Sequence, residues 1–453
     1  MNKQLILIDK NEASKKIPSI IKADDLCYYI SKDFLSFTKL QKAIPEECKV
    51  LSLGGIFNKE IKLIRRKYID LFADLAKKHD SLEWWSTQIA SKNSATIPLQ
   101  LNITYLFCAS SIIRKFISDN KFSRLILIVD SYALIDSIVQ LNTKYKLKIS
   151  LPFFYSLKKK IKYFRIFVKY LARIIHFVFK MYRYKNLLPK KYNNKIIDVI
   201  KKDNVIIIKS WITKGTLSKK GHYNDRNFGD LPNILSNKNY KVCIMPMFFN
   251  VDLLSKEMRS LMLKQNIPFL IQEQFLGLKD LIKAALHSWK NININLHRIS
   301  IDNIDLTKIF REVQLAEGFN FTTMHSMLSF FLLKKMSDLG IRVKNFNYPF
   351  ENNMQEKLFV LGCKSFFPNS EIIAYQHTAW YQNQLGMSIG KNEKNLHPTA
   401  DKIICSGTKY LDILEKSGFS GKKLIAGPNL RYTDVYEDNN DLNKIINKPI
   451  VPM

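Results

Sequence analysis

Residues 341–378 read IRVKNFNYPFENNMQEKLFVLGCKSFFPNSEIIAYQHT, and this stretch decides the expected fold class. Residues 341–346 predict a strand, residues 352–363 have a helical pattern, and residues 371–375 predict a second strand. Most of the strands predicted along the chain are continuous apolar runs rather than alternating ones, which is typical of strands covered on both faces. The alternation of strand and helix therefore favours an α/β protein with parallel sheets.

The same alternation extends over nearly the whole chain. Other helical patterns cover 59–78, 253–264, 275–289 and 322–339. The full set of predicted strands is 5–8, 49–53, 125–129, 205–209, 242–245, 268–272, 341–346, 371–375, 402–405 and 423–426. With 453 residues, the chain is too long for a single hydrophobic core, so more than one doubly wound domain is expected.

We expect one large N-terminal α/β domain over residues 1–390. The glycines and asparagines of residues 385–400 indicate a boundary, and a second domain then begins at residues 395–453. A Rossmann-like half usually needs more than about 100 residues. The expectation is therefore that this second domain is incomplete and that the chain is cut short.

The positive charge is concentrated in one segment. The chain has 71 Lys+Arg against 39 Asp+Glu, a formal net charge of +32. Half of that charge falls in residues 137–197, which hold 13 Lys and 3 Arg but no Asp or Glu. Within a predicted helical insertion at 150–200, basic residues recur every three or four positions. They are Lys162, Arg165, Lys169, Arg173, Lys180 and Arg183.

Bulky apolar residues and tyrosines accompany this basic stripe, as in helices that lie in a membrane interface. We expect the segment to bind an anionic membrane surface. Two alternatives stay open: an amphipathic helix that completes the core, and a groove for nucleic acid. The lysine-rich composition of an AT-rich genome would also explain part of the charge.

The sequence has neither a signal-peptide pattern nor an apolar run of 18 residues. The six cysteines are scattered and form no metal-binding pattern, which indicates free thiols in a reducing compartment. A cytoplasmic protein that needs no metal or other cofactor is expected.

Candidate catalytic residues follow two of the predicted strands. Gln376 and His377 end the strand at 371–375, and Glu351 follows the strand at 341–346. Ligands of open α/β sheets bind outside the carboxyl ends of strands. If the two strands are neighbours, Glu351 and His377 face one crevice and form a general-base pair. A structural histidine and a carboxylate that favours a helix N-terminus are the alternatives.

Two further groups of residues are candidates for substrate contacts. Ser406 and Gly407 precede a predicted helix, and Arg431 follows the strand at 423–426, so these residues suit a donor phosphate. Gln376 and the residues Trp84, Trp85, Lys92 and Asn93 suit a sugar. The tryptophans could equally close a core, and Arg431 could be an ordinary surface residue.

Taken together, these motifs resemble a family of bacterial surface-carbohydrate biosynthesis proteins regarded as glycosyltransferases. The resemblance rests on Trp84–Thr87 with Ser91–Asn93, Pro349–Asn352 with Glu356 and Lys357, Ile373–Thr378, His397–Pro398 with Asp401–Ile403, and Gly427–Pro428 with Leu430–Tyr432. It implies two Rossmann-like domains of GT-B type, a nucleotide-activated sugar as donor and a lipid-linked surface polysaccharide as acceptor. It also implies a peripheral position on the inner face of the cytoplasmic membrane.

Two other classes of function remain. A non-catalytic scaffold of polysaccharide assembly would keep the basic helix and tolerate changes at Glu351 and His377. A nucleic-acid-binding protein would explain the charge, but the sequence has no recognised nucleic-acid motif. We therefore expect no nucleic acid among the partners.

Overall fold

The computed structural model describes residues 3–9, 21, 25–44, 48–92, 97–118, 122–143, 145–151, 154–202, 204–213, 215–318, 320–380 and 384–432. The chain divides into two compact units. Unit 1 comprises Met1–His79, Thr87–Arg173 and Trp289–Asn320. Unit 2 comprises Asp80–Ser86, Ile174–Ser288 and Phe321–Met453. The chain thus crosses between the units several times.

Unit 1 is built on a parallel five-stranded sheet of order β3-β2-β1-β4-β5. This order matches the first five strands of the Rossmann order 3-2-1-4-5-6. Its strands are β1 (Lys3–Ile8), β2 (Leu26–Tyr29), β3 (Lys49–Ser52), β4 (Phe122–Ile128) and β5 (Lys148–Ser150). Its helices are α1 (Phe34–Ala43), α2 (Gly54–His79), α4 (Leu99–Ser118), α5 (Tyr132–Asn142) and α12 (Thr307–Gly318). The short strands β8 (Ser300–Ile301) and β9 (Ile304–Asp305) form an antiparallel pair.

Unit 2 is built on a parallel six-stranded sheet of order β13-β12-β11-β10-β6-β7. Its strands are β6 (Val205–Ile212), β7 (Val242–Phe248), β10 (Val343–Pro349), β11 (Glu371–Gln376), β12 (Lys402–Ser406) and β13 (Leu424–Gly427). Its α-helices are α3 (Leu82–Trp85), α7 (Lys190–Lys202), α8 (Leu231–Asn237), α9 (Lys256–Lys264), α10 (Gln272–Phe275), α13 (Phe321–Asp338), α14 (Met354–Phe366) and α15 (Thr408–Lys416). Its 3-10 helices are η2 (Leu385–Met387), η3 (Lys391–Glu393), η4 (Gly421–Lys423) and η5 (Leu430–Tyr432).

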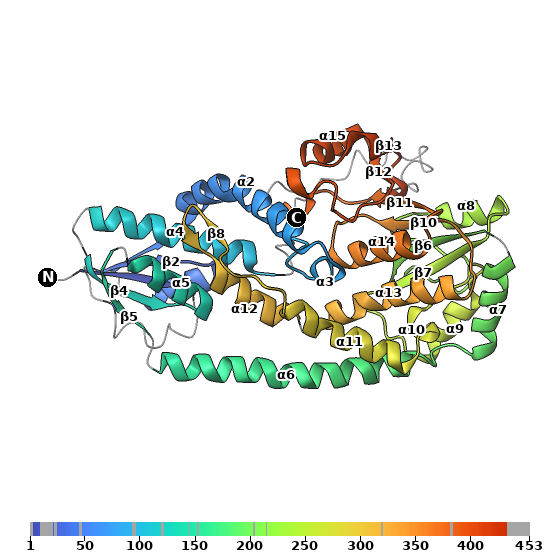
Figure 1. Ribbon diagram of the computed structural model, residues 1–453, viewed down its shortest axis with the longest axis horizontal. Coiled ribbons are helices and arrows are strands. Elements are labelled where there is room, and N and C mark those ends of the chain that lie inside the picture. The colour runs from blue at the N-terminus through green and yellow to red at the C-terminus, as the bar shows by residue number, and fades with distance from the viewer. Residues whose placement is uncertain are drawn as a thin grey trace. The chain divides into compact units, whose positions relative to one another are not determined.

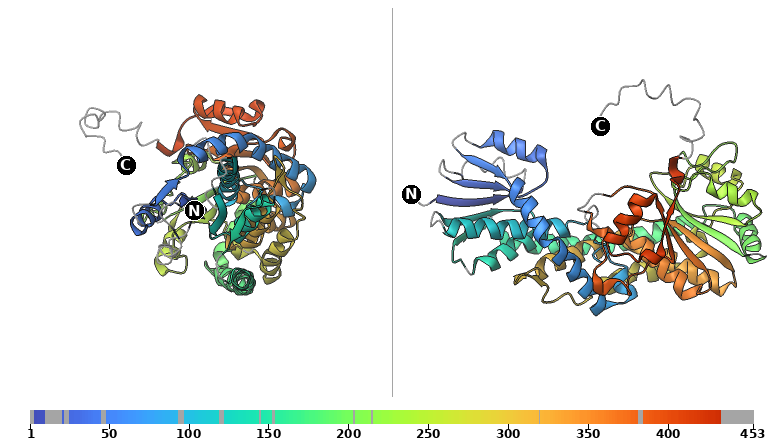
Figure 2. Two further views of the ribbon diagram at one scale, coloured as in Figure 1. Left: turned by 90° about the vertical axis from the view of Figure 1, so that its left-hand side faces the viewer. Right: turned by 90° about the horizontal axis from the view of Figure 1, so that it is seen from above.

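The sheet of unit 2 is buried on both faces, as its apolar strands predict. In β6, Val205 and Ile207 join one core cluster with α13 and α14, the orange helices in Figures 1 and 2. Ile206 and Ile208 join a second cluster that includes α9. Successive side chains of a strand point to opposite faces, so a continuous run of isoleucines serves both cores. The α/β class with parallel sheets is thus confirmed.

The expected domain boundary at residues 390–395 does not hold. β11 and β12, on either side of it, pair directly, with Ala374 opposite Ile403. The segment is glycine- and asparagine-rich because it makes tight buried turns, not because it is a linker. His397 bonds through Nε2 to Oδ1 of Asn352 at 2.7 Å and through Nδ1 to Oε1 of Glu393 at 3.0 Å. The strands β12 and β13, assigned to a separate domain, belong to the sheet of unit 2.

One predicted strand is wrong, and four strands of the described residues were not predicted. Residues 268–272 make only an isolated bridge, Ile244 to Phe269, before α10 begins. β2, β5, β8 and β9 are short, and no strand was predicted at their positions. The other nine predicted strands all overlap observed ones.

The basic segment is helical, as expected, but consists of two helices. α6 (Tyr155–Tyr184), the long green helix of Figure 1, is followed by α7. The division between the units passes through α6 after Arg173, and through α11 (Leu278–Ile292) after Ser288. Among the described residues, no helix is both long and apolar enough to cross a membrane.

Candidate functional site

The strand order of unit 2 reverses between β6 and β10. From β6 the chain continues to β7 on one side, whereas β10, β11, β12 and β13 follow one another on the other side. In open α/β sheets the ligand crevice opens at such a switch point, outside the carboxyl ends of the strands. The residues that follow β6, β10 and β11 are therefore where a site is expected.

The register of β10 and β11 brings Glu351 and His377 together. Pro349 lies opposite Tyr375, and the two candidate residues each follow two positions later. The Nε2 atom of His377 lies 3.4 Å from Oε1 of Glu351. His377 is buried, whereas the side chain of Glu351 is 38% exposed. The expectation that both residues face one crevice is met by this geometry.

Glu351 is not the residue that caps α14. Asn353 is the N-cap and accepts a hydrogen bond from the backbone N–H of Glu356 at 3.2 Å. The Glu356 carboxylate accepts hydrogen bonds from the backbone N–H groups of Glu351 and Asn352. Burial, with the nearby charge of Glu351, raises the pKa of Glu356 well above its usual range. The Glu351 side chain is thus left at the crevice.

A cavity of about 320 Å³ contains the Glu351–His377 pair. We call it the dyad cavity. It is lined by Trp211, Thr213, Arg226, Asn227, Phe249, Glu351, His377, Thr378 and Arg431. The predicted phosphate-binding residue Arg431 is therefore brought to the predicted catalytic residues. The Nδ2 atom of Asn227 and the Nδ1 atom of His377 are buried and have no hydrogen-bond partner among the described residues.

The buried carboxylate of Asp225 positions Arg226 and Asn227. It accepts hydrogen bonds from Ser210 Oγ, from the Tyr223 hydroxyl and from the backbone N–H groups of Asn227 and Phe228. Burial raises the pKa of Asp225, although these four donors oppose the shift. The turn closes through two backbone hydrogen bonds between Asp225 and Gly229. These hydrogen bonds therefore fix the conformation of the loop that carries Arg226.

This arrangement can bind an anion and move a proton. Two guanidinium groups, from Arg226 and Arg431, are suited to phosphate because their N–H donors match its oxygens. A histidine beside a carboxylate can take a proton from a hydroxyl near neutral pH.

Gln376, Ser406 and Gly407 serve the fold rather than the cavity. Gln376 Oε1 accepts hydrogen bonds from the backbone N–H and the hydroxyl of Ser406, and its Nε2 donates to Thr378. The N–H of Gly407 donates to the carbonyls of Cys405 and Gly427. The N–H groups expected to hold a phosphate are thus already used within the sheet.

The expected sugar platform is a core. Trp84 and Trp85 are each 1% exposed, so neither ring can stack on a ligand. Trp85 donates to Asp80 at 2.8 Å, and the Lys357 ammonium lies 5.5 Å from a Trp85 ring centre. Lys92, in unit 1, is also 1% exposed. Asn93 lies outside the described residues.

Unit 2 has a second polar cluster that was not predicted from the sequence. A cavity of about 360 Å³ is lined in part by Lys209, Gln272, Glu273, His325 and Ser329, and we call it the Lys209 cavity. In the local sequence, this cavity could have been noticed from Lys209, a lysine within the buried run VIIIKSWI of β6. Its other polar residues come from α10 and α13, which no local pattern connects with β6.

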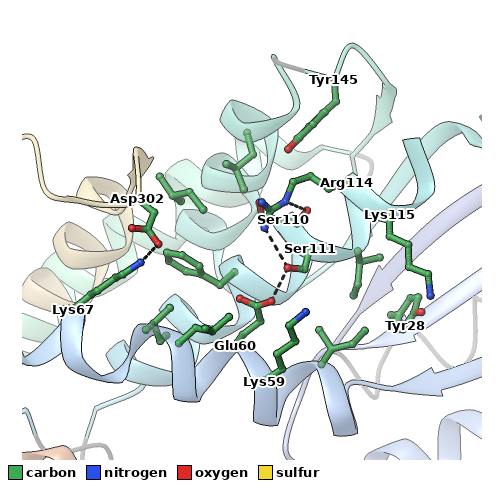
Figure 3. A pocket seen from close by; sticks show the side chains of 17 residues that line it. Tyr28, Lys59, Glu60, Lys67, Ser110, Ser111, Arg114, Lys115, Tyr145 and Asp302 are labelled. Atoms are coloured by element: carbon green, nitrogen blue, oxygen red, sulfur yellow. Dashed lines mark hydrogen bonds and ion pairs between the residues drawn. The ribbon is translucent and has the colours of Figure 1, made fainter. Parts of the chain in front are cut away.

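Unit 1 has a larger cavity of about 810 Å³ between α2 and α4 (Figure 3). Several of its polar groups contact one another: Lys67 contacts Asp302 at 2.5 Å, and Ser111 donates to Glu60 at 2.6 Å. Arg114 in turn donates to Ser111. No histidine lines this cavity, so it offers no pair comparable to Glu351 and His377.

The basic residues expected to bind a membrane lie on α6 in two different settings. Arg165, Lys169, Arg173 and Arg183 are exposed. Lys162 instead pairs with Glu312 at 2.8 Å, and Lys180 lies 4.8 Å from the centre of the Phe321 ring. One exposed face of α6 is apolar. It presents Leu157, Ile161, Phe164, Val168, Leu171, Ile175, Phe179 and Tyr182.

The described residues contain no group of three or more His, Cys, Asp or Glu side chains arranged to hold a metal ion. Comparison with known proteins gives no match: no family model, no curated protein and no solved structure is similar to this chain.

Proposed function

We propose that this protein is a glycosyltransferase that moves a sugar from a nucleotide-activated donor to a lipid-linked surface polysaccharide. The observation that carries the proposal is the Glu351–His377 pair, which shares its cavity with Arg226 and Arg431 at the switch point of unit 2. The two parallel α/β units are compatible with a GT-B architecture, and that architecture is part of the proposal.

In the proposed reaction, an acceptor hydroxyl enters beside His377, which removes its proton while Glu351 stabilises the resulting imidazolium. The acceptor oxygen bonds to the anomeric carbon of the sugar. The bond from that carbon to the donor phosphate breaks, and its electron pair leaves with the nucleotide. Arg226 and Arg431 bind the negative charge of the leaving phosphate. We propose that these arginines do so without a metal.

The test is glycan analysis of cells that express His377→Ala or Glu351→Ala in place of the natural protein. Loss of a general base typically lowers a rate about 10²–10⁴-fold, so both variants should lose surface polysaccharide. Glu371→Gln is the matched control, because Glu371 lies at the amino end of β11 and pairs with Lys402 at 2.6 Å. Normal polysaccharide in both cavity variants would instead favour a non-catalytic scaffold.

We also propose that α6 holds the protein on the inner face of the cytoplasmic membrane. Apolar side chains recur along one face at intervals of three or four residues, and Phe164 and Ile175 are 67% and 69% exposed. Exposed basic residues such as Lys169 lie beside that face. A helix with this pattern inserts its apolar stripe among lipid chains and places its cations at anionic headgroups.

A further inference from the structure

The Lys209 cavity and the dyad cavity adjoin, because Trp211 lines both. Lys209 and Trp211 are two residues apart on β6, the strand at the switch point of the sheet. Two adjoining cavities at one switch point suit a reaction between two substrates. The residues of the Lys209 cavity indicate which substrate it takes.

Lys209 is a buried cation that no carboxylate of the described residues pairs with. It is 2% exposed. Its Nζ atom lies 3.3 Å from Ser329 Oγ and 3.4 Å from the carbonyl oxygen of Gln355, and 4.6 Å from the centre of the Phe359 ring. A buried ammonium group without a counter-ion costs folding free energy. An anionic ligand in the cavity would supply the missing negative charge.

A chain of hydrogen bonds connects Lys209 to a histidine on the cavity wall. Ser329 Oγ donates to Gln272 Oε1 at 3.0 Å. The Nε2 atom of His325 lies 3.0 Å from Gln272 Nε2 and 2.9 Å from Glu273 Oε1. The Phe321 ring stacks on His325 at an interplanar angle of 15° and thereby fixes its orientation. The cluster is therefore a polar site held by hydrogen bonds, and it contains the buried cation of Lys209.

The C-terminal part of α6 forms another wall of this cavity. Lys180, Met181 and Tyr184 line it. Their neighbours Phe179 and Tyr182 are 61% and 48% exposed. The same helical turns thus face the cavity on one side and present apolar side chains to the surroundings on the other.

We propose that the Lys209 cavity binds the phosphate headgroup of an amphiphilic acceptor, whose hydrocarbon chain lies along the exposed apolar face of α6. Lys209 and Lys180 bind the phosphate, and His325 contributes a further donor when protonated. Trp211 places this headgroup beside the Glu351–His377 pair. The assignment rests on the proposed function, since it names the acceptor class of the same reaction.

Calorimetric titration of the purified chain with three probes tests the proposal. Farnesyl phosphate carries both parts of the ligand, farnesol only the chain, and inorganic phosphate only the headgroup. We expect farnesyl phosphate to bind most tightly, and Lys209→Met to weaken it about 10- to 100-fold, the range for a hydrogen-bonded charge. The matched control is Lys334→Met, because Lys334 forms an exposed pair with Asp338.

Equal affinity for inorganic phosphate and farnesyl phosphate would overturn the amphiphile assignment and indicate a soluble anion. Unchanged binding in Lys209→Met would overturn the site itself. If Lys209→Met does not fold, Lys180→Met on the partly exposed wall tests the same contact. Because no donor is present, these outcomes are independent of the glycan analysis of His377→Ala, so either proposal can fail alone.

Discussion

A single buried charge, that of Lys209, has consequences for the stability of unit 2. Burial lowers its pKa to about 8, and the charges of Glu356 and Cys363 only partly oppose this shift. In the unfolded chain a lysine titrates near pH 10.4. Because the folded state releases the proton first, the free energy of unfolding rises with pH between about 8 and about 10.4.

Replacing this lysine with the similarly long but uncharged methionine removes that dependence. At pH 7 we expect Lys209→Met to have a higher free energy of unfolding than the natural chain. The difference in free energy of unfolding between the variant and the natural chain should shrink by at most about 3 kcal/mol when the pH is raised from 7 to 10.5. Urea unfolding of both proteins at several pH values measures the difference. A difference that stays constant with pH would show that Lys209 has the same pKa in the folded and the unfolded chain.

Trp85 was predicted to contact a sugar, but its contacts show that it belongs to a core. Its ring meets His397 edge-on at 5.3 Å and lies under Lys357. Trp85→Ala should therefore lower the free energy of unfolding by about 3–5 kcal/mol, as for other buried tryptophans. Trp85→Phe should recover much of that loss. A stability change below about 1 kcal/mol in Trp85→Ala, with lost activity, would restore the role in sugar binding.

The proximity of two residues could be predicted where it depended only on two neighbouring strands. Glu351 and His377 each follow their own strand, so the pairing of two adjacent parallel strands is enough to bring them together. Gln376 and Trp85 failed, because their partners Ser406 and His397 lie in segments that only the folded chain brings near.

At the scale of elements, α6 packs one face into a core and leaves another face exposed. Phe177 and Met181 are buried in the core of unit 2, whereas the opposite face is exposed and apolar. Sequence periodicity found the basic stripe correctly. It could not separate the apolar residues that pack inside from those left outside, since both sets recur at helical spacing.

Replacing exposed apolar residues of α6 should therefore weaken membrane binding without unfolding the protein. Burying a Phe or Ile side chain in lipid is worth about 1.5–3 kcal/mol, so Phe164→Glu and Ile175→Glu should each weaken binding to anionic vesicles at least about 10-fold. Flotation with vesicles of anionic and of neutral lipid measures this. Both sites are exposed, so stability should change by no more than about 0.5 kcal/mol.

Ser156→Glu is the charge-matched control, because it adds the same charge at an exposed position of α6 without removing an apolar side chain. It should bind nearly as well as the natural protein. Equal loss in this control would mean that net charge, not the apolar face, governs attachment. A natural protein that stays unbound even at low salt would refute attachment altogether.

Strand prediction depended on how well each strand is buried. β6, β7 and β11 contain apolar runs because both faces of their sheet are covered. β5 has only three residues, none of them buried, and gives no such signal. Residues 268–272 are apolar and look like a strand, yet they contribute only one bridge before the chain turns into α10.

At the scale of the whole molecule, the division into units differs from what composition indicated, and this difference can be tested directly. A chain that ends at residue 390 lacks β12 and β13, and its β11 loses the strand that pairs with Ile373–Gln376. Ending the chain there also removes four residues from one core cluster: Ile403, Cys405, Leu414 and Phe419. The loss of several buried side chains, each worth about 2–5 kcal/mol, exceeds the stability of a typical domain.

We therefore expect the chain of residues 1–390 to aggregate, or to show no cooperative unfolding of unit 2, when compared with the full chain under the same conditions. Circular dichroism during thermal unfolding and hydrogen exchange at β10 and β11 measure this. The exchange data are decisive, because unit 1 has its own sheet and can retain secondary structure on its own account. Full protection of β10 and β11 in the shortened chain would mean that residues 390–395 do separate independent domains, and that β12 only docks onto a sheet already stable without it.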